Sequence, residues 1–105
     1  MRILKITEYS IEFDNGKDIS FDHYQESCEI NYADFEQLDS LARDVDFSEP
    51  LVFESCDYGF RFGNPPINMF FVPCYSIQNG YYSSELDIWY DGKEVIHGIE
   101  CPVAS

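Results

Sequence analysis

The sequence predicts an α+β domain, in which one antiparallel sheet of six or seven strands carries one helix packed on one face, in two layers. Two observations lead to this fold class. Residues 8–22 alternate polar and apolar side chains, as half-buried strands do, whereas residues 32–43 repeat apolar side chains at helical spacing. The 105 residues fit a single domain spanning 1–105.

A first strand is expected from near Arg2, followed by a β-hairpin over residues 8–22. A three-residue loop, with Gly16 left-handed at its end, keeps the apolar side chains on one face. This register pairs Ile11 with Ile19 and Tyr9 with Phe21. On the other face it sets Glu12 opposite Asp18 and Glu8 opposite Asp22. Because like charges directly opposite destabilise a sheet, the hairpin is expected to carry a modest energetic cost.

Residues 32–43 are predicted to form the helix, with Asn31 as its N-cap. Residues 51–56 are expected to pair with residues 60–62. The apolar run 67–72 reads as a central strand that Pro73 ends.

Residues 74–84 are expected to form an uncharged, tyrosine-rich loop. The last hairpin joins residues 86–90 to residues 93–99 through an Asp91-Gly92 turn. This register places Ile88 opposite Val95 and Leu86 opposite His97.

The net charge of −14, from 20 acidic residues against 6 basic ones, excludes whole classes of function. Such a surface repels nucleic acid and anionic membranes, and it attracts basic proteins by long-range steering. No apolar run approaches the roughly 18 residues of a membrane span, and no signal peptide is apparent. The widely spaced cysteines are therefore predicted to be reduced thiols in the cytoplasm.

Four segments together resemble a family of small acidic proteins of unassigned function from bacteria and phages. These segments are NYADFEQLDSLAR, GFRFG, FFVPCYSIQNGYYS and LDIWYDGK. The resemblance implies a compact standalone domain in a mobile-element setting, where small acidic proteins include anti-CRISPR inhibitors and immunity proteins. It implies no catalytic or binding residues.

Two histidine–cysteine pairs have spacings compatible with zinc half-sites, namely His23 with Cys28 and His97 with Cys101. A small metal-dependent or cysteine enzyme using His23 and Cys28 is therefore one alternative. Buried, inert cysteines and structural histidines are the other interpretation, and we predict no metal, no cofactor and no catalytic residue.

The preferred hypothesis is a non-enzymatic acidic binding module that inhibits a basic, nucleic-acid-handling protein, such as a nuclease, by mimicking nucleic acid. Carboxylates on alternate strand residues stand about 6.6–6.8 Å apart, a separation close to that of backbone phosphates. A third interpretation is a homodimer formed through the tyrosine-rich loop. The residues predicted to bind the partner are Glu8, Glu12, Asp14, Asp18, Asp22, Asp34, Glu36, Asp39, Tyr81 and Tyr82.

Overall fold

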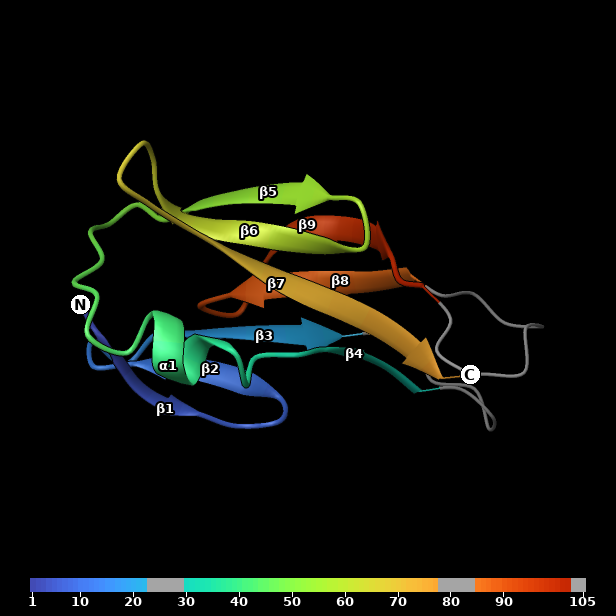
Figure 1. Ribbon diagram of the computed structural model, residues 1–105, viewed down its shortest axis with the longest axis horizontal. Helices are drawn as coiled ribbons and strands as arrows, with labels where there is room; N and C mark the ends of the chain where they lie inside the picture. The colour runs from blue at the N-terminus through green and yellow to red at the C-terminus, as the bar shows by residue number, and fades with distance from the viewer. Residues whose placement is uncertain (23–29, 78–84, 103–105) are drawn as a thin grey trace.

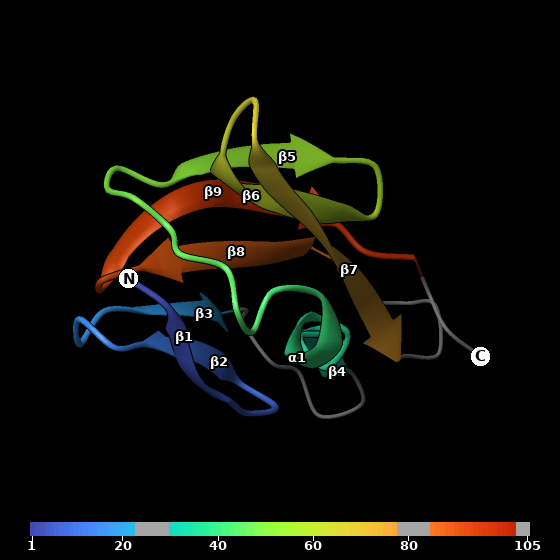
Figure 2. The ribbon, with the colours of Figure 1, turned by 60° about the vertical axis from the view of Figure 1, so that its left-hand side comes forward.

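The computed structural model describes residues 1–22, 30–77 and 85–102. These residues form two antiparallel sheets stacked as a β-sandwich, with one very short helix. The predicted α+β class is therefore wrong. In Figures 1 and 2 the long strand β7 crosses obliquely over the other sheet.

The five-stranded sheet has the order β1-β2-β3-β8-β9, and every pairing in it is antiparallel. Its strands are β1 (Ile3–Ile6), β2 (Ser10–Phe13), β3 (Asp18–Asp22), β8 (Glu85–Tyr90) and β9 (Lys93–Glu100). The four-stranded sheet has the order β4-β7-β6-β5. Its strands are β4 (Ile30–Ala33), β5 (Val52–Cys56), β6 (Gly59–Asn64) and β7 (Asn68–Ile77).

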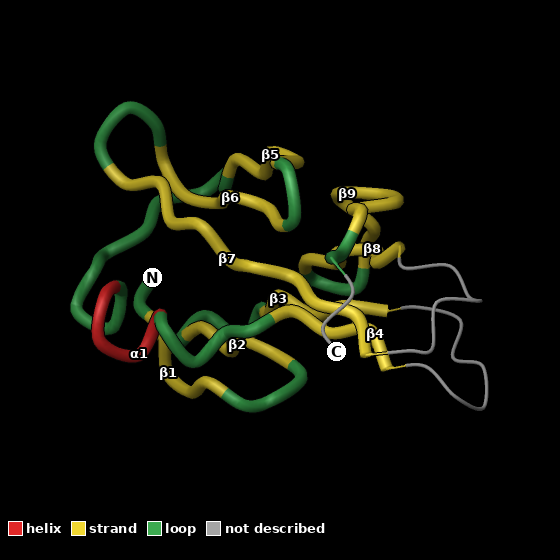
Figure 3. Tube along the Cα trace, turned by 45° about the vertical axis from the view of Figure 1, so that its right-hand side comes forward, coloured by secondary structure: helices red, strands yellow, loops and turns green. Residues whose placement is uncertain are grey.

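The helix predicted over 32–43 is wrong in length: the structure has only α1 (Leu38–Leu41), which Figure 3 shows in red near the N-terminus. The start of that segment is strand β4, which pairs with the end of β7. Asn31 is therefore not an N-cap. It lies buried in β4, where it accepts a hydrogen bond from the Ser76 hydroxyl and donates one to the Glu85 carbonyl oxygen at 3.2 Å.

Strand β7 also continues past Pro73, where the sequence predicted its end. Pro73 lies opposite Gly59 at the last β6–β7 pair, and the following residues pair with β4 instead. Pro73 lacks an N–H, but its carbonyl oxygen accepts a hydrogen bond from Asp34 at 2.8 Å. The proline therefore marks a change of partner strand, and residues 74–77 are strand where a loop was expected.

The central hairpin is confirmed where β2 meets β3. Ile11 pairs with Ile19 and Glu12 with Asp18, and Gly16 has a φ of +87°. The expected pairing of Glu8 with Asp22 is not formed, because the chain turns at residues 7–10 and β2 begins only at Ser10.

Glu12 has two cross-strand neighbours: Asp18 on β3 and Lys5 on β1. A lysine therefore flanks the like-charged pair and reduces its expected cost.

Aromatic side chains fill the space between the two sheets. Phe62, which has no exposed surface, lies 5.6–6.3 Å from the rings of Phe47, Phe53, Phe60 and Phe70, measured between ring centroids. Burial of phenylalanine on this scale, worth roughly 1.5–3 kcal/mol per side chain, compensates for the small size of the domain.

Candidate functional site

A cleft of about 590 Å³ lies where the β1–β2 turn approaches β3, β4 and the segment that follows β4. We call it the anionic cleft, because carboxylates and aromatic side chains line it together. Its lining residues are Thr7, Glu8, Tyr9, Phe21, Asn31, Tyr32, Ala33, Asp34, Phe35 and Glu36.

Short polar contacts fix the two rims of the anionic cleft. On one rim, Thr7 Oγ1 accepts hydrogen bonds from the backbone N–H groups of Tyr9 and Ser10 at 3.1 and 3.0 Å. On the other rim, Asp34 Oδ1 accepts the backbone N–H of Glu36 at 3.1 Å. Such side-chain turns hold the backbone in place locally.

Aromatic rings run side by side along the anionic cleft. The centroid of Phe21 lies 6.4 Å from that of Tyr9 and 6.0 Å from that of Phe35. Tyr9 is 70% exposed, so its ring is open to a ligand. Aromatic faces beside carboxylates attract a cationic side chain through cation–π and charge–charge contacts.

The structure brings three of the predicted partner-binding residues, Glu8, Asp34 and Glu36, to this one cleft. Asp39 lies on α1 close to Glu36, and its carboxylate is paired with the Arg43 guanidinium at 3.2 Å. Sequence spacing did not indicate that Glu8 and Asp34 would line one cleft, because the chain between them passes through β2 and β3.

The other predicted acidic residues lie elsewhere. Glu12 and Asp18 are neighbours across β2 and β3. Asp14 lies in the β2–β3 turn, where its carboxylate accepts the Arg2 N–H at 3.1 Å. Asp22 ends β3, opposite Asp87 of β8. The expected ladder of carboxylates is therefore not continuous: Glu8, Asp34 and Glu36 line the anionic cleft, whereas Glu12 and Asp18 pair with each other across β2 and β3.

Four residues named in the sequence-based hypotheses, His23, Cys28, Tyr81 and Tyr82, lie outside the described residues. Within the described residues, Cys74 and Cys101 are buried. The neighbouring Cys101 thiol, together with burial, raises the pKa of Cys74, which disfavours a thiolate at Cys74. His97 is exposed, whereas Cys101 is buried, so these two do not form a half-site.

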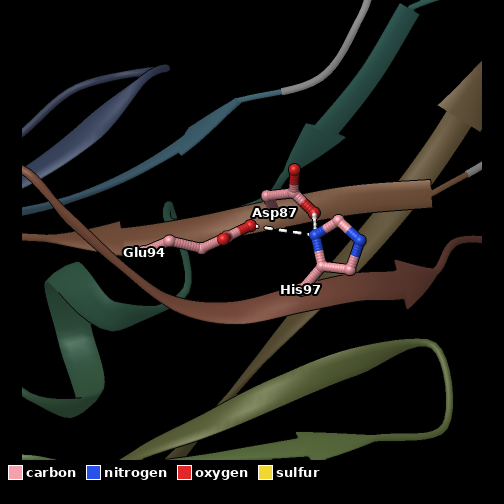
Figure 4. Close-up of side chains that lie close together, drawn as sticks. All are labelled: Asp87, Glu94 and His97. Atoms are coloured by element: carbon pink, nitrogen blue, oxygen red, sulfur yellow. Dashed lines mark hydrogen bonds and ion pairs between the residues drawn. The ribbon is translucent and has the colours of Figure 1, made fainter.

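His97 instead lies beside two carboxylates, Asp87 of the neighbouring strand β8 and Glu94 of its own strand β9, as Figure 4 shows. Its Nδ1 lies 3.0 Å from Asp87 Oδ1 and 2.9 Å from Glu94 Oε1. Hydrogen bonding to Glu94 and the charges of Asp87, Glu94 and Glu85 raise the pKa of His97 above its ordinary 6.5.

Two β-bulges in β9 create this cluster. Leu86 pairs with Ile99 but Ile88 pairs with Ile96, so Asp87 lies opposite both His97 and Gly98, whose φ is +72°. The predicted register, with Ile88 opposite Val95 and Leu86 opposite His97, is therefore wrong.

The second bulge inserts Val95 between Glu94, the partner of Trp89, and Ile96, the partner of Ile88. Glu94 and His97 are three residues apart and would point to opposite faces of a regular strand. The extra residue puts both on one face. The signals in the sequence were Gly98 and the Glu-x-x-His spacing, and neither indicates a bulge without the partner strand.

No family model, curated protein or solved structure matches this chain. Among the described residues, no helix is long and apolar enough to cross a membrane.

Proposed function

We propose that this protein is a non-enzymatic binding module for a basic, nucleic-acid-handling protein. The anionic cleft receives one arginine or lysine side chain of that partner. The observation that carries the proposal is the convergence of Glu8, Asp34 and Glu36 around aromatic rings in one cleft. Two interactions would act together: a local contact in the cleft and the long-range electrostatic attraction due to the net charge.

The local contact is suited to a guanidinium or ammonium group. Glu36 is exposed and Asp34 is half-buried, so both carboxylates are accessible at the rim. Arginine is favoured over lysine, because its planar guanidinium stacks on rings while it donates in pairs to carboxylates. Arginine and tyrosine are also the residue types most often found at the energetic centre of an interface.

The long-range field selects the kind of partner. A net charge of −14 on 105 residues accelerates encounter with a basic protein and repels polynucleotides. Proteins with strongly basic grooves are those that hold DNA or RNA phosphates. Carboxylates that remain adjacent on the sheet, such as Glu12 and Asp18, lie outside the cleft and add to this field.

Binding of a fluorescent arginine-rich peptide, measured by anisotropy, tests the cleft directly. The test variant carries Glu8→Gln, Asp34→Asn and Glu36→Gln. Asparagine at position 34 keeps an oxygen for the Glu36 N–H, so the turn should persist. The matched control removes the same charge at three exposed acids outside the cleft, Asp44→Asn, Asp57→Asn and Asp91→Asn.

Both triple variants lose three negative charges, so the difference between their affinities for the peptide reports the contribution of the cleft alone. We expect the cleft variant to weaken binding at least about 10-fold more than the control, which corresponds to roughly 1.4 kcal/mol. Equal losses in the two variants would contradict a role for the cleft.

The identity of the partner class needs a separate experiment. Proteins captured from a bacterial lysate should be basic, and duplex DNA should displace them from the immobilised protein. Capture that DNA does not compete would contradict the nucleic-acid-handling partner while leaving the cleft result intact.

A further inference from the structure

We propose that Asp87, Glu94 and His97 form a binding site for a divalent transition-metal ion of the zinc type, held by three protein ligands and completed by water. The site is separate from the anionic cleft and does not rest on the function proposed above. Its ligand atoms are one imidazole nitrogen and two carboxylate oxygens, all within 4.8 Å of one another.

The geometry of the three atoms suits a metal ion. His97 Nδ1 stands 3.0 and 2.9 Å from the two oxygens. Adjacent ligands of an octahedral ion with bonds of about 2.1 Å lie roughly 3.0 Å apart, and those of a tetrahedral zinc ion lie roughly 3.3 Å apart. Small side-chain adjustments at this exposed position would accommodate either geometry.

Electrostatics at the cluster also favour a cation. A neutral imidazole has only one proton on Nδ1 to share between two carboxylates. Two carboxylates thus face this one nitrogen, and Glu85 adds to the negative field around it. A divalent ion in place of that proton would neutralise both carboxylates and bind the imidazole lone pair at once.

The surrounding backbone orients one ligand in advance. The Gly98 N–H donates to Asp87 Oδ1 at 2.9 Å, and the left-handed conformation of Gly98 makes this contact possible. Hydrogen bonds of this kind fix ligand orientation in metal sites. Figure 4 shows the other ring nitrogen of His97 pointing away from the carboxylates, so Nδ1 is the ligand.

The donor set selects the class of metal. An imidazole with two carboxylates suits zinc and its first-row neighbours, whereas calcium and magnesium prefer oxygen ligands alone. The proton and the metal compete for Nδ1, so binding should weaken as pH falls. The charged groups facing His97 are Asp87 and Glu94, with Glu85 nearby.

Two titrations of the full chain test the site. Isothermal calorimetry with Zn²⁺ at pH 7.5 should give one ion per chain, and an excess of Mg²⁺ should not compete. Cobalt offers an optical readout, because its bound form absorbs visible light. It should also quench Trp89, which is the only tryptophan in the chain and lies opposite Glu94.

Variants then identify the ligands. His97→Ala, Asp87→Asn and Glu94→Gln should each weaken Zn²⁺ binding at least about 10-fold. The controls are His23→Ala, which removes the only other histidine, and Asp44→Asn, which removes an exposed carboxylate elsewhere; both should bind as the parent does.

Wild-type NMR supplies a readout that needs no substitution. Zinc should shift the His97 imidazole signals and leave those of His23 in place. The proposal is overturned if the parent chain shows neither calorimetric heat nor a cobalt band, if His23→Ala abolishes binding, or if His97→Ala leaves the affinity unchanged.

Discussion

The two sheets of this protein differ sharply in charge. The strands of the five-stranded sheet carry seven carboxylates, two lysines and His97. The four described strands of the other sheet contain one acid and one base, Glu54 and Arg61, and these two form an ion pair with each other.

This difference separates two tasks within a small domain. The four-stranded sheet supplies most of the phenylalanine cluster, whose rings need no charged neighbours. The five-stranded sheet carries most of the strand carboxylates, and it contains the cluster of Asp87, Glu94 and His97. We therefore expect substitutions in the four-stranded sheet to affect folding and substitutions in the five-stranded sheet to affect cation recognition.

The largest effect on stability is expected from Phe62→Ala. The side chain is fully buried among four other rings, so its loss should lower the free energy of unfolding by about 3–5 kcal/mol. Urea denaturation measures the change. Leu4→Ala, at a 65% exposed position of the acidic sheet, is the control and should stay within about 0.5 kcal/mol of the parent.

Asn31→Ala should cost about 1–3 kcal/mol, because it removes a buried amide that joins the two sheets. The comparison with Ser76→Ala sharpens this prediction. If the Asn31–Ser76 bond matters, the double variant should lose less stability than the sum of the single variants. Strict additivity in thermal unfolding would count against the bond.

Removing one carboxylate from each sheet should change stability in opposite directions. Asp18→Asn relieves repulsion with Glu12 and should stabilise by about 0.2–1 kcal/mol, whereas Glu54→Gln breaks the exposed pair with Arg61 and should destabilise slightly. Chemical denaturation in urea reports both changes. Salt should reduce the two effects, and equal signs would contradict the contrast between the sheets.

The smallest effect is the pH dependence that His97 contributes. Its pKa is raised in the folded protein, so the stabilisation is complete below the unfolded value of about 6.5 and is lost as pH rises through the folded pKa. NMR titration of the His97 ring measures this pKa. Glu94→Gln should lower it toward the ordinary value, and an unchanged pKa would show that Glu94 does not set it.

Local rules predicted the turns well. Gly16 closes the β2–β3 hairpin in the expected register, and Asp91 with Gly92 forms the β8–β9 turn with both φ angles positive. The pairing of β5 with β6 was also predicted, although the turn is shorter than expected because Gly59 already belongs to β6. These features depend on residues close in sequence, so the alternation of side chains suffices to place them.

Structure that depends on distant partner strands could not be predicted from local patterns in the same way. Apolar residues at helical spacing in 32–43 made a helix the natural prediction, yet the chain forms β4 first and only one helical turn later. Phe35, Leu38 and Ala42 are buried, as that spacing required, whereas Leu41 is 62% exposed. The pattern was compatible with two structures, and the available partner strand decided between them.

The sequence alone determined the net charge, the reverse turns and the alternating faces of the β2–β3 hairpin, since each follows from residue types within a few positions. Only the tertiary structure decided that residues 30–33 would pair with residues 74–77, and that β9 would bulge twice against β8. The physical reason is that strand pairing and register take their energy from partners distant in sequence. The anionic cleft arises from such pairings, whereas the Asp87–Glu94–His97 cluster arises from the two bulges of the β8–β9 hairpin, whose strand β8 also pairs with the distant β3.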